Sequence, residues 1–506
     1  MIDSTTNKRI AKNTLLLYFR QILIMLVSLY TVRIVLSILG VEDYGIYNVV
    51  AGIVSMFGFL SGSMAIASQR FFSFELGRKD YERLQKTFSI SIEIYALIAI
   101  TIILAAETIG LWFVKNKLVI PADRMNAALW IYQLSILSFI LSIITTPYMA
   151  VIIARENMDI YAYISIIEAA LKLGSVFLLK VFIVDKLKLY GMLLFLVMFI
   201  NSVLYVLVCR KRYPESHFRF LWDISMFRTL FSFSVWNLFG SSVGVVKNQA
   251  INILLNMHFG PVVNAARGIA SQVNSAVTSF AQSFSTAVRP QIIKQFAASK
   301  KEEMMSLVFQ SSKATAYLMF FFVLPLVFEM PLVINLWLGQ IPEFVVLFTR
   351  LVLIDALIDS ISYPLMTAAQ ATGKIKLYQS VVGGVLLLNL PVSYIALKLK
   401  APAESVMIIA IIITAIAFVI RLVIIKKLLE FSIIQYFKKV VVPVLLVIFL
   451  SSLVLFIFNR SLNQGLLRLF LSIILSIISI AGFIILFGLT NEERKYLAKY
   501  FKKIIR

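Results

Sequence analysis

The chain has little of what metal sites and soluble enzymes are built from. Its 506 residues include one cysteine and two histidines, and only 14% of residues are charged. A single cysteine, Cys209, excludes an internal disulfide, and the absence of a Cys/His cluster leaves no zinc site to expect. No G-x-x-x-x-G-K-[ST] loop is present, so a P-loop nucleotide site is excluded as well. We expect no catalytic residues, no metal and no cofactor.

Acidic residues are also scarce, with 25 Asp and Glu against 48 Lys and Arg and a net charge of +23. Such a charge could indicate nucleic-acid binding, but most of the basic residues fall on alternate connections between apolar segments. This is the positive-inside bias of membrane proteins, and it predicts cytoplasmic N- and C-termini, lipid headgroup contacts and no nucleic-acid partner. The basic residues on the opposite connections are Lys115, Lys117, Arg124, Lys186, Lys188, Lys398, Lys400, Arg460 and Arg468.

What the chain does have is apolar surface. Hydrophobic residues make up 60% of it and the mean hydropathy is +0.92. A soluble domain could not hide this much, so we predict an all-α polytopic membrane protein. A spanning helix needs about 20 apolar residues. About fourteen segments qualify, near 12–38, 44–68, 88–114, 126–153, 161–184, 189–209, 230–257, 262–288, 314–338, 344–369, 377–397, 403–425, 439–458 and 466–489.

Two stretches of the sequence resemble each other. "TTPYMAVIIARENMDIYAY" begins at Thr145 and "SYPLMTAAQATGKIKLYQS" at Ser362, which aligns Pro147 with Pro364. The glycines before the second and eighth segments, Gly40 and Gly260, match at nearly the same offset. These matches predict two six-helix bundles in parallel orientation, 1–215 and 216–430, followed by helices 13 and 14 and a basic cytoplasmic tail in 431–506. Each bundle can close on its own core, so we expect a monomer.

The eighth segment is unusually polar for a spanning helix. Polar side chains recur at intervals of three and four and form one stripe along it. Close helix packing would explain single serines, but a stripe over the full membrane depth favours a water-filled passage, because such groups are costly in lipid. The stripe runs through Asn264, Arg267, Ser271, Asn274, Thr278, Gln282, Ser285 and Arg289, and it is widened by Ser275, Ser279, Ser283 and Thr286.

Neighbouring segments carry further polar residues and an excess of cations. Asn248 and Asn252 lie on the seventh segment and Asn48 on the second, which we assign to the same polar passage. The cations expected inside the membrane are Arg20, Arg33, Lys247 and Arg267. Snorkelling to the interface is the alternative, and it suits Arg33 best. Together these cations predict an anionic substrate, since guanidinium groups hold phosphate oxygens well.

Acidic residues within the expected spans include Glu93, Glu107, Glu168, Asp355 and Asp359. Glu168 and Lys172 are four residues apart on one helix and are expected to pair. The two aspartates share one helix face with no obvious partner. They are our candidates for ion coupling, because intramembrane carboxylates can carry protons.

Two of these stretches also resemble a known family of membrane proteins. The polar stretch "NAARGIASQVNSAVTSFAQSFSTAVRPQI" and the early "RIVLSILGVEDYGIYNVV" resemble the polysaccharide-export, or O-antigen flippase, branch of the multidrug/oligosaccharidyl-lipid/polysaccharide (MOP) exporter superfamily. The resemblance implies a bacterial inner-membrane flippase that moves undecaprenyl-pyrophosphate-linked oligosaccharide by alternating access. It further implies membrane lipids, an O-antigen polymerase and chain-length machinery as partners, and a polyprenyl groove at helices 13 and 14.

Other functions remain open at this point. A lipid II flippase for peptidoglycan precursor shares the architecture. A cation-coupled multidrug antiporter of the same superfamily usually has twelve helices and an acidic lumen, whereas this chain is expected to have fourteen helices and a basic one. A glycan polymerase or ligase would need a sizeable outer loop, and all expected connections are short.

Overall fold

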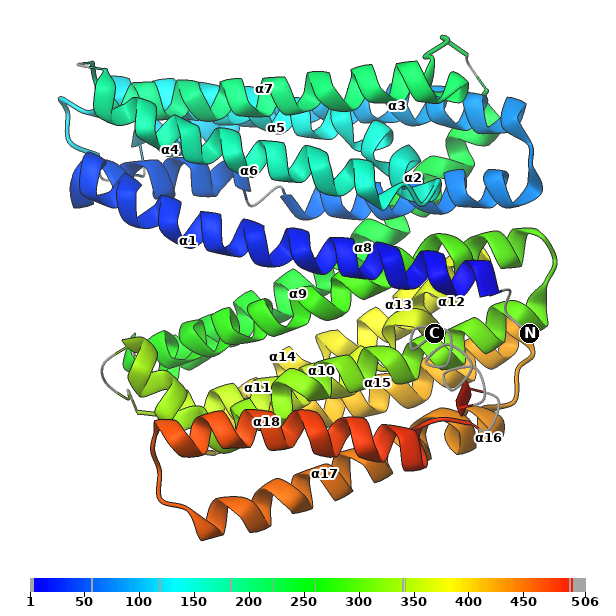
Figure 1. The fold of residues 1–506 in the computed structure, drawn as a ribbon. Coiled ribbons are helices and arrows are strands. Elements are labelled where there is room, and N and C mark those ends of the chain that lie inside the picture. Colours follow the sequence, from blue (N-terminus) through cyan, green and yellow to red (C-terminus); the bar gives the residue numbers. More distant parts are fainter. Residues whose placement is uncertain are drawn as a thin grey trace, which may run out of the picture. The chain divides into compact units, whose positions relative to one another are not determined.

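The computed structural model describes residues 4–55, 58–116, 118, 120–182, 184–221, 223–259, 261–338, 341, 343–490 and 493–494. Every regular element among them is helical (Figure 1). Two compact units are formed, one by the residues up to 241 together with 293–299, the other by 242–292 and the residues from 300 onward.

The N-terminal unit begins with α1 (Ser4–Ser55), which contains two helical legs separated at Gly40. Gly40 has φ 75° and ψ 173°, a conformation that only glycine adopts without strain, so this residue ends the first leg. The other elements of the unit are α2 (Gly58–Arg78), α3 (Tyr81–Ala105), η1 (Ala106–Gly110), α4 (Leu111–Asn116), α5 (Met125–Ala154), α6 (Met158–Val181), α7 (Lys186–Arg212) and η2 (Pro214–Ser216).

α5 is the central helix of this unit. It packs against α2, α3 and α7, while α1 packs against α6. Ile131 and Tyr132 of α5 are fully buried, and the Tyr132 hydroxyl donates a hydrogen bond to the carbonyl of Ala106. Helix starts are set by aspartates: Asp80 accepts from the Arg83 N–H, and Asp185 accepts from two N–H groups of the first turn of α7.

α8 (Ile224–Phe259) and α9 (Pro261–Ala297) each contribute residues to both units. The C-terminal unit continues with α10 (Lys301–Leu338), α11 (Val345–Ser360), α12 (Tyr363–Ala371), α13 (Lys376–Leu387), α14 (Asn389–Lys398), α15 (Ser405–Leu429), α16 (Ile433–Tyr436), η3 (Phe437–Val441), α17 (Val442–Ser461), α18 (Leu466–Phe483) and η4 (Ile484–Gly488). The changes of unit fall inside helices, and the domain limits expected near 216 and 431 stay a prediction.

The repeated stretches fold alike. The first ends α5 at Ala154 and the second ends α12 at Ala371, and a new helix follows each after a short turn. Pro147 and Pro364 are both buried within these helices. Each repeated stretch therefore forms the end of one helix, a short turn and the start of the next helix.

The protein is a multi-pass membrane protein. Among the described residues, eleven helices are long and apolar enough to cross a membrane, and all eleven coincide with expected spans. The other three expected spans correspond to the second leg of α1 with α2, to α9, and to α11 with α12. α9 is not among these eleven helices because its many polar residues lower its mean hydropathy.

Candidate substrate-binding site

The C-terminal unit brings a predicted cation and a predicted anion together. The Lys247 ammonium on α8 lies 3.6 Å from a carboxylate oxygen of Asp355 on α11, and the two side chains are 14% and 24% exposed. Intramembrane charges of opposite sign usually pair in this way, because each is costly alone. The sequence analysis left Asp355 without a partner; Lys247 is that partner.

Arg267, near the start of α9, lies in the same unit and is buried. One guanidinium nitrogen donates to the Asn248 side-chain oxygen at 3.2 Å. Nε and the second terminal nitrogen of Arg267 are buried without a hydrogen-bond partner, as is one carboxylate oxygen of Asp355. Arg267 is within electrostatic range of Asp355. Lys247, Arg267 and Asp355 together carry two positive charges and one negative charge. Two guanidinium nitrogens of Arg267 can still donate hydrogen bonds, and an anionic ligand would accept them, because a buried donor without an acceptor is costly.

The polar residues of α9 divide into accessible and buried ones. Thr278, expected in the passage, is buried, and its hydroxyl donates to the Asn274 carbonyl of its own helix. Ser271 and Asn274 are half-buried, and Gln282 is exposed. Among the residues that widen the stripe, Ser275 is exposed, and Ser279 and Thr286 are half-buried. Gln272, which the sequence analysis did not single out, is exposed on the same helix.

Two further predicted residues have other contacts. The Arg20 guanidinium of α1 stacks over the Tyr161 ring of α6 at 4.6 Å, and its Nε is buried without a hydrogen bond. Asn252 is half-buried on α8. The structure does not describe the side chains of Arg33, Asn48 and Asn264.

Nearby on α6, the predicted pair of Glu168 and Lys172 is confirmed, with 2.7 Å between the charged atoms. The other Glu168 oxygen accepts from the Asn201 amide at 3.0 Å.

Asp359 also has a partner that the sequence did not reveal. Its carboxylate lies 2.6 Å from the Arg421 guanidinium of α15, a side chain only 3% exposed. Arg421 lies within α15, which continues to Leu429, and it is buried. A paired Asp359 is less suited to carrying protons than an unpaired one. The rule that buried membrane charges pair was the signal that could have identified Arg421.

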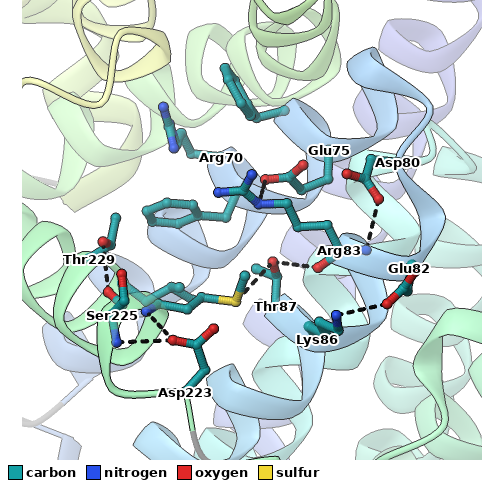
Figure 2. Close-up of a pocket in the computed structure, with 14 residues that line it drawn as sticks. Arg70, Glu75, Asp80, Glu82, Arg83, Lys86, Thr87, Asp223, Ser225 and Thr229 are labelled. Atoms are coloured by element: carbon teal, nitrogen blue, oxygen red, sulfur yellow. Dashed lines mark hydrogen bonds and ion pairs between the residues drawn. The ribbon is translucent and has the colours of Figure 1, made fainter.

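A cavity that the sequence did not predict lies in the N-terminal unit (Figure 2). Its volume is about 440 Å³, and the ends of α2, α3 and α8 enclose it. Arg83 pairs with Glu75 at 3.4 Å, and Asp223 accepts from the N–H groups of Ser225 and Met226. The cavity is lined by charged side chains of both signs, most of which form ion pairs or hydrogen bonds with their neighbours. None of the predicted site residues lines this cavity.

Burial changes the ionisation of this region. It lowers the pKa of the Arg70 guanidinium to about 10. It also raises the pKa of Glu75, against the opposing effect of Arg83. Within the described ranges, no cluster of His, Cys, Asp and Glu has the composition of a metal site.

Comparison with known proteins gives the class first. The chain has the fold of MOP-superfamily transporters. It matches a multidrug resistance MATE family transporter of that superfamily in an outward-facing conformation, with a TM-score of 0.74 and 11% identity over 84% of this chain and 96% of that one. It also matches a MOP superfamily transporter from Pyrococcus furiosus described as having a binding pocket of reverse polarity, with a TM-score of 0.71 and 10% identity over 83% and 96%.

The family follows from the sequence itself. Residues 10–296 match the model of the polysaccharide biosynthesis protein family, and the chain belongs to that family. The search of curated proteins finds no match. The resemblance drawn from the polar eighth segment is thereby confirmed at the level of family and superfamily fold, and a transporter rather than an enzyme is the class that fits both.

Proposed function

We propose that the protein is a flippase for undecaprenyl-pyrophosphate-linked oligosaccharide, an O-antigen, capsule or exopolysaccharide repeat unit. It would carry this lipid from the inner to the outer leaflet of a bacterial cytoplasmic membrane by alternating access. Membership of a polysaccharide biosynthesis family supports a lipid-linked glycan as the substrate class.

The observation that carries the proposal is the Arg267 guanidinium. It is buried in a membrane protein beside Lys247 and Asp355, it keeps two donors unused, and its surroundings have a net positive charge. A pyrophosphate offers several acceptor oxygens and two negative charges, which match these donors. Uncharged glycans alone would give no reason to bury two cations.

The accessible amide and hydroxyl groups of α9 support the glycan part of the substrate. Gln272, Ser275 and Gln282 are exposed along one helix face, and such groups exchange hydrogen bonds readily with sugar hydroxyls. Arg20 and Arg33 remain candidate cations of the N-terminal half. Asn48, Asn252 and Asn264 remain candidates for the same passage.

The test is complementation in cells that lack their own O-antigen flippase but make a matched repeat unit. Wild-type protein should restore surface glycan, and Arg267→Ala and Lys247→Ala should fail at equal membrane abundance. Lys180→Gln is the matched control, since Lys180 is an exposed cation at the end of α6. Full export by both alanine variants would refute the cationic site.

The same cells distinguish the alternatives. Rescue of lipid II translocation instead of glycan export would identify the peptidoglycan flippase, and resistance to cationic drugs without glycan export would identify an antiporter. We expect polymerase and chain-length machinery to act on the delivered glycan, and a monomer to suffice for transport.

A further inference from the structure

Helices α17 and α18 lie beside each other at the end of the chain and pack on α10 (Figure 1). Their outer faces expose large apolar side chains, among them Phe449, Phe456, Phe470 and Ile478. Lipid is as apolar as these side chains, so the hydrophobic effect does not fix such a hairpin against its neighbour. Van der Waals packing of buried side chains such as Val447, Leu455 and Ile480 contributes to its attachment. Two polar contacts lie at the two ends of its interface with α10, and these can specify its orientation.

One contact is in the half of the interface near the α17–α18 connection. Glu329 of α10 is completely buried, and it lies 2.9 Å from the Arg468 guanidinium of α18. Its other oxygen lies 3.1 Å from the Ser472 hydroxyl, and Arg468 also donates to the Leu462 carbonyl in the connection. Glu329 lies within an expected span, but the sequence analysis did not single it out.

The second contact follows the opposite end of α18. Lys313 of α10, with its side chain 4% exposed, lies 2.5 Å from Glu493 and donates to the Gly488 carbonyl at 3.3 Å. The Tyr317 hydroxyl donates to the same carbonyl at 3.2 Å. A Cβ on Gly488 would lie 2.7 Å from that hydroxyl oxygen, so the backbone approaches α10 as closely as glycine allows.

The two pairs have opposite polarity. Lys313 and Glu329 are sixteen residues apart on one helix, which places them about 24 Å apart along α10. α10 supplies the cation at one end and the anion at the other. A hairpin docked upside down would place Lys313 near Arg468 and leave two carboxylates together. A buried pair adds little stability compared with apolar packing, but it does select one register and one orientation.

We propose that Lys313, Glu329, Arg468 and Glu493 are positioning residues for transport. They fasten the α17–α18 hairpin to α10, so that it moves with the C-terminal unit as one rigid part throughout the transport cycle. The hairpin is therefore a fixed wall and not a gate. This inference rests on the proposed transport function.

The experiment replaces one ion pair with a covalent link. Lys313→Cys with Glu493→Cys is expressed in the flippase-deficient cells, and export is measured per protein in the membrane before and after a short bis-methanethiosulfonate cross-linker. We expect the unlinked variant to be slower by about tenfold, because the hairpin loses one of the two ion pairs that select its orientation on α10. Linking should bring export back to within about twofold of wild type.

A hairpin that must move would give the opposite result: linking would abolish export, and the proposal would be overturned. Wild-type-like export of the unlinked variant would also overturn it. Each single cysteine variant with the reagent is the control, and the one natural cysteine, Cys209, is buried. The charge swap Lys313→Glu with Glu493→Lys should restore export that either single change loses. Failure of the wild type to export any matched glycan would instead count against the proposed function.

Discussion

The Lys247 ammonium and the Asp355 carboxylate lie 3.6 Å apart across α8 and α11, inside the C-terminal unit. In the absence of substrate, this carboxylate offsets part of the positive charge of Lys247 and Arg267. Substitutions of Lys247 and of Asp355 should therefore affect transport differently. Lys247→Gln removes a cation that the pyrophosphate needs. Asp355→Asn removes only a competing anion.

We therefore expect Asp355→Asn to retain more glycan export than Lys247→Gln at equal abundance. The amount of surface glycan in the complementation assay ranks the export activities of the two variants. Ion coupling through Asp355 predicts the opposite result, in which Asp355→Asn loses export together with any pH dependence of the transport rate. The reverse order of activities with the pH dependence unchanged would mean that Asp355 contacts substrate directly.

Binding of a simple anion tests the Arg267 site without glycan. Inorganic pyrophosphate should raise the melting temperature of the detergent-purified wild type, because a ligand of the folded state stabilises it by about 2.7 kcal/mol at a hundred times its Kd. Arg267→Ala should lose most of this shift, and Lys180→Gln should keep it. An equal shift in all three proteins would indicate general surface binding of the anion.

The accessible face of α9 can be mapped by cysteine labelling. Cysteines at Gln272, Ser275 and Gln282 should react with a water-soluble maleimide in the membrane, and a cysteine at buried Thr278 should not. Background from Cys209 should be low, since it is buried. Labelling of Thr278→Cys at the rate of the others would contradict its burial in the packed face of α9.

Acid should weaken one polar cluster of the N-terminal unit. Arg124 bridges Asp43 and Asp185, at 3.1 Å from the latter. Burial acts to raise the pKa of Asp185, but hydrogen bonds from the Lys188 N–H and from Arg124 outweigh it, and the pKa is lowered. The stabilisation is thus complete above about pH 4, the ordinary range of aspartate, and disappears as the pH falls through the lower folded value.

Arg124→Gln should lower the free energy of unfolding by about 1 kcal/mol, since the three side chains are partly exposed. Melting temperatures of wild type and variant should differ by a constant amount from pH 5 to 8 and converge below about pH 4. A difference that grows in acid would contradict this assignment.

Gly40 should be intolerant of a side chain for a backbone reason alone. A Cβ at Gly40 would meet nothing within 4 Å, but its φ of 75° and ψ of 173° are unfavourable for any other residue. Gly40→Ala should cost about 1–3 kcal/mol. Gly174→Ala is the control, because Gly174 is equally uncrowded within α6 and has an ordinary helical backbone, so the change should be neutral or slightly stabilising.

The amino-acid sequence alone determined the class, the positions of the helices and the polar character of α9. These follow from local properties: apolar runs of spanning length, basic connections, and a glycine such as Gly40 at the turn between two helical legs. The Glu168–Lys172 pair was predictable for the same reason, because residues four apart on one helix must be neighbours.

Partners far apart in sequence were decided only by the tertiary structure. Asp355 meets Lys247, Asp359 meets Arg421, and Glu329 meets Arg468 across helices whose mutual rotation no local pattern encodes. Which polar residues of α9 stay accessible also depends on that rotation: Ser275 and Gln282 are exposed, whereas Thr278 is buried. The periodicity of polar residues predicts a polar face on a helix. The packing of neighbouring helices decides which residues of that face remain accessible to a substrate.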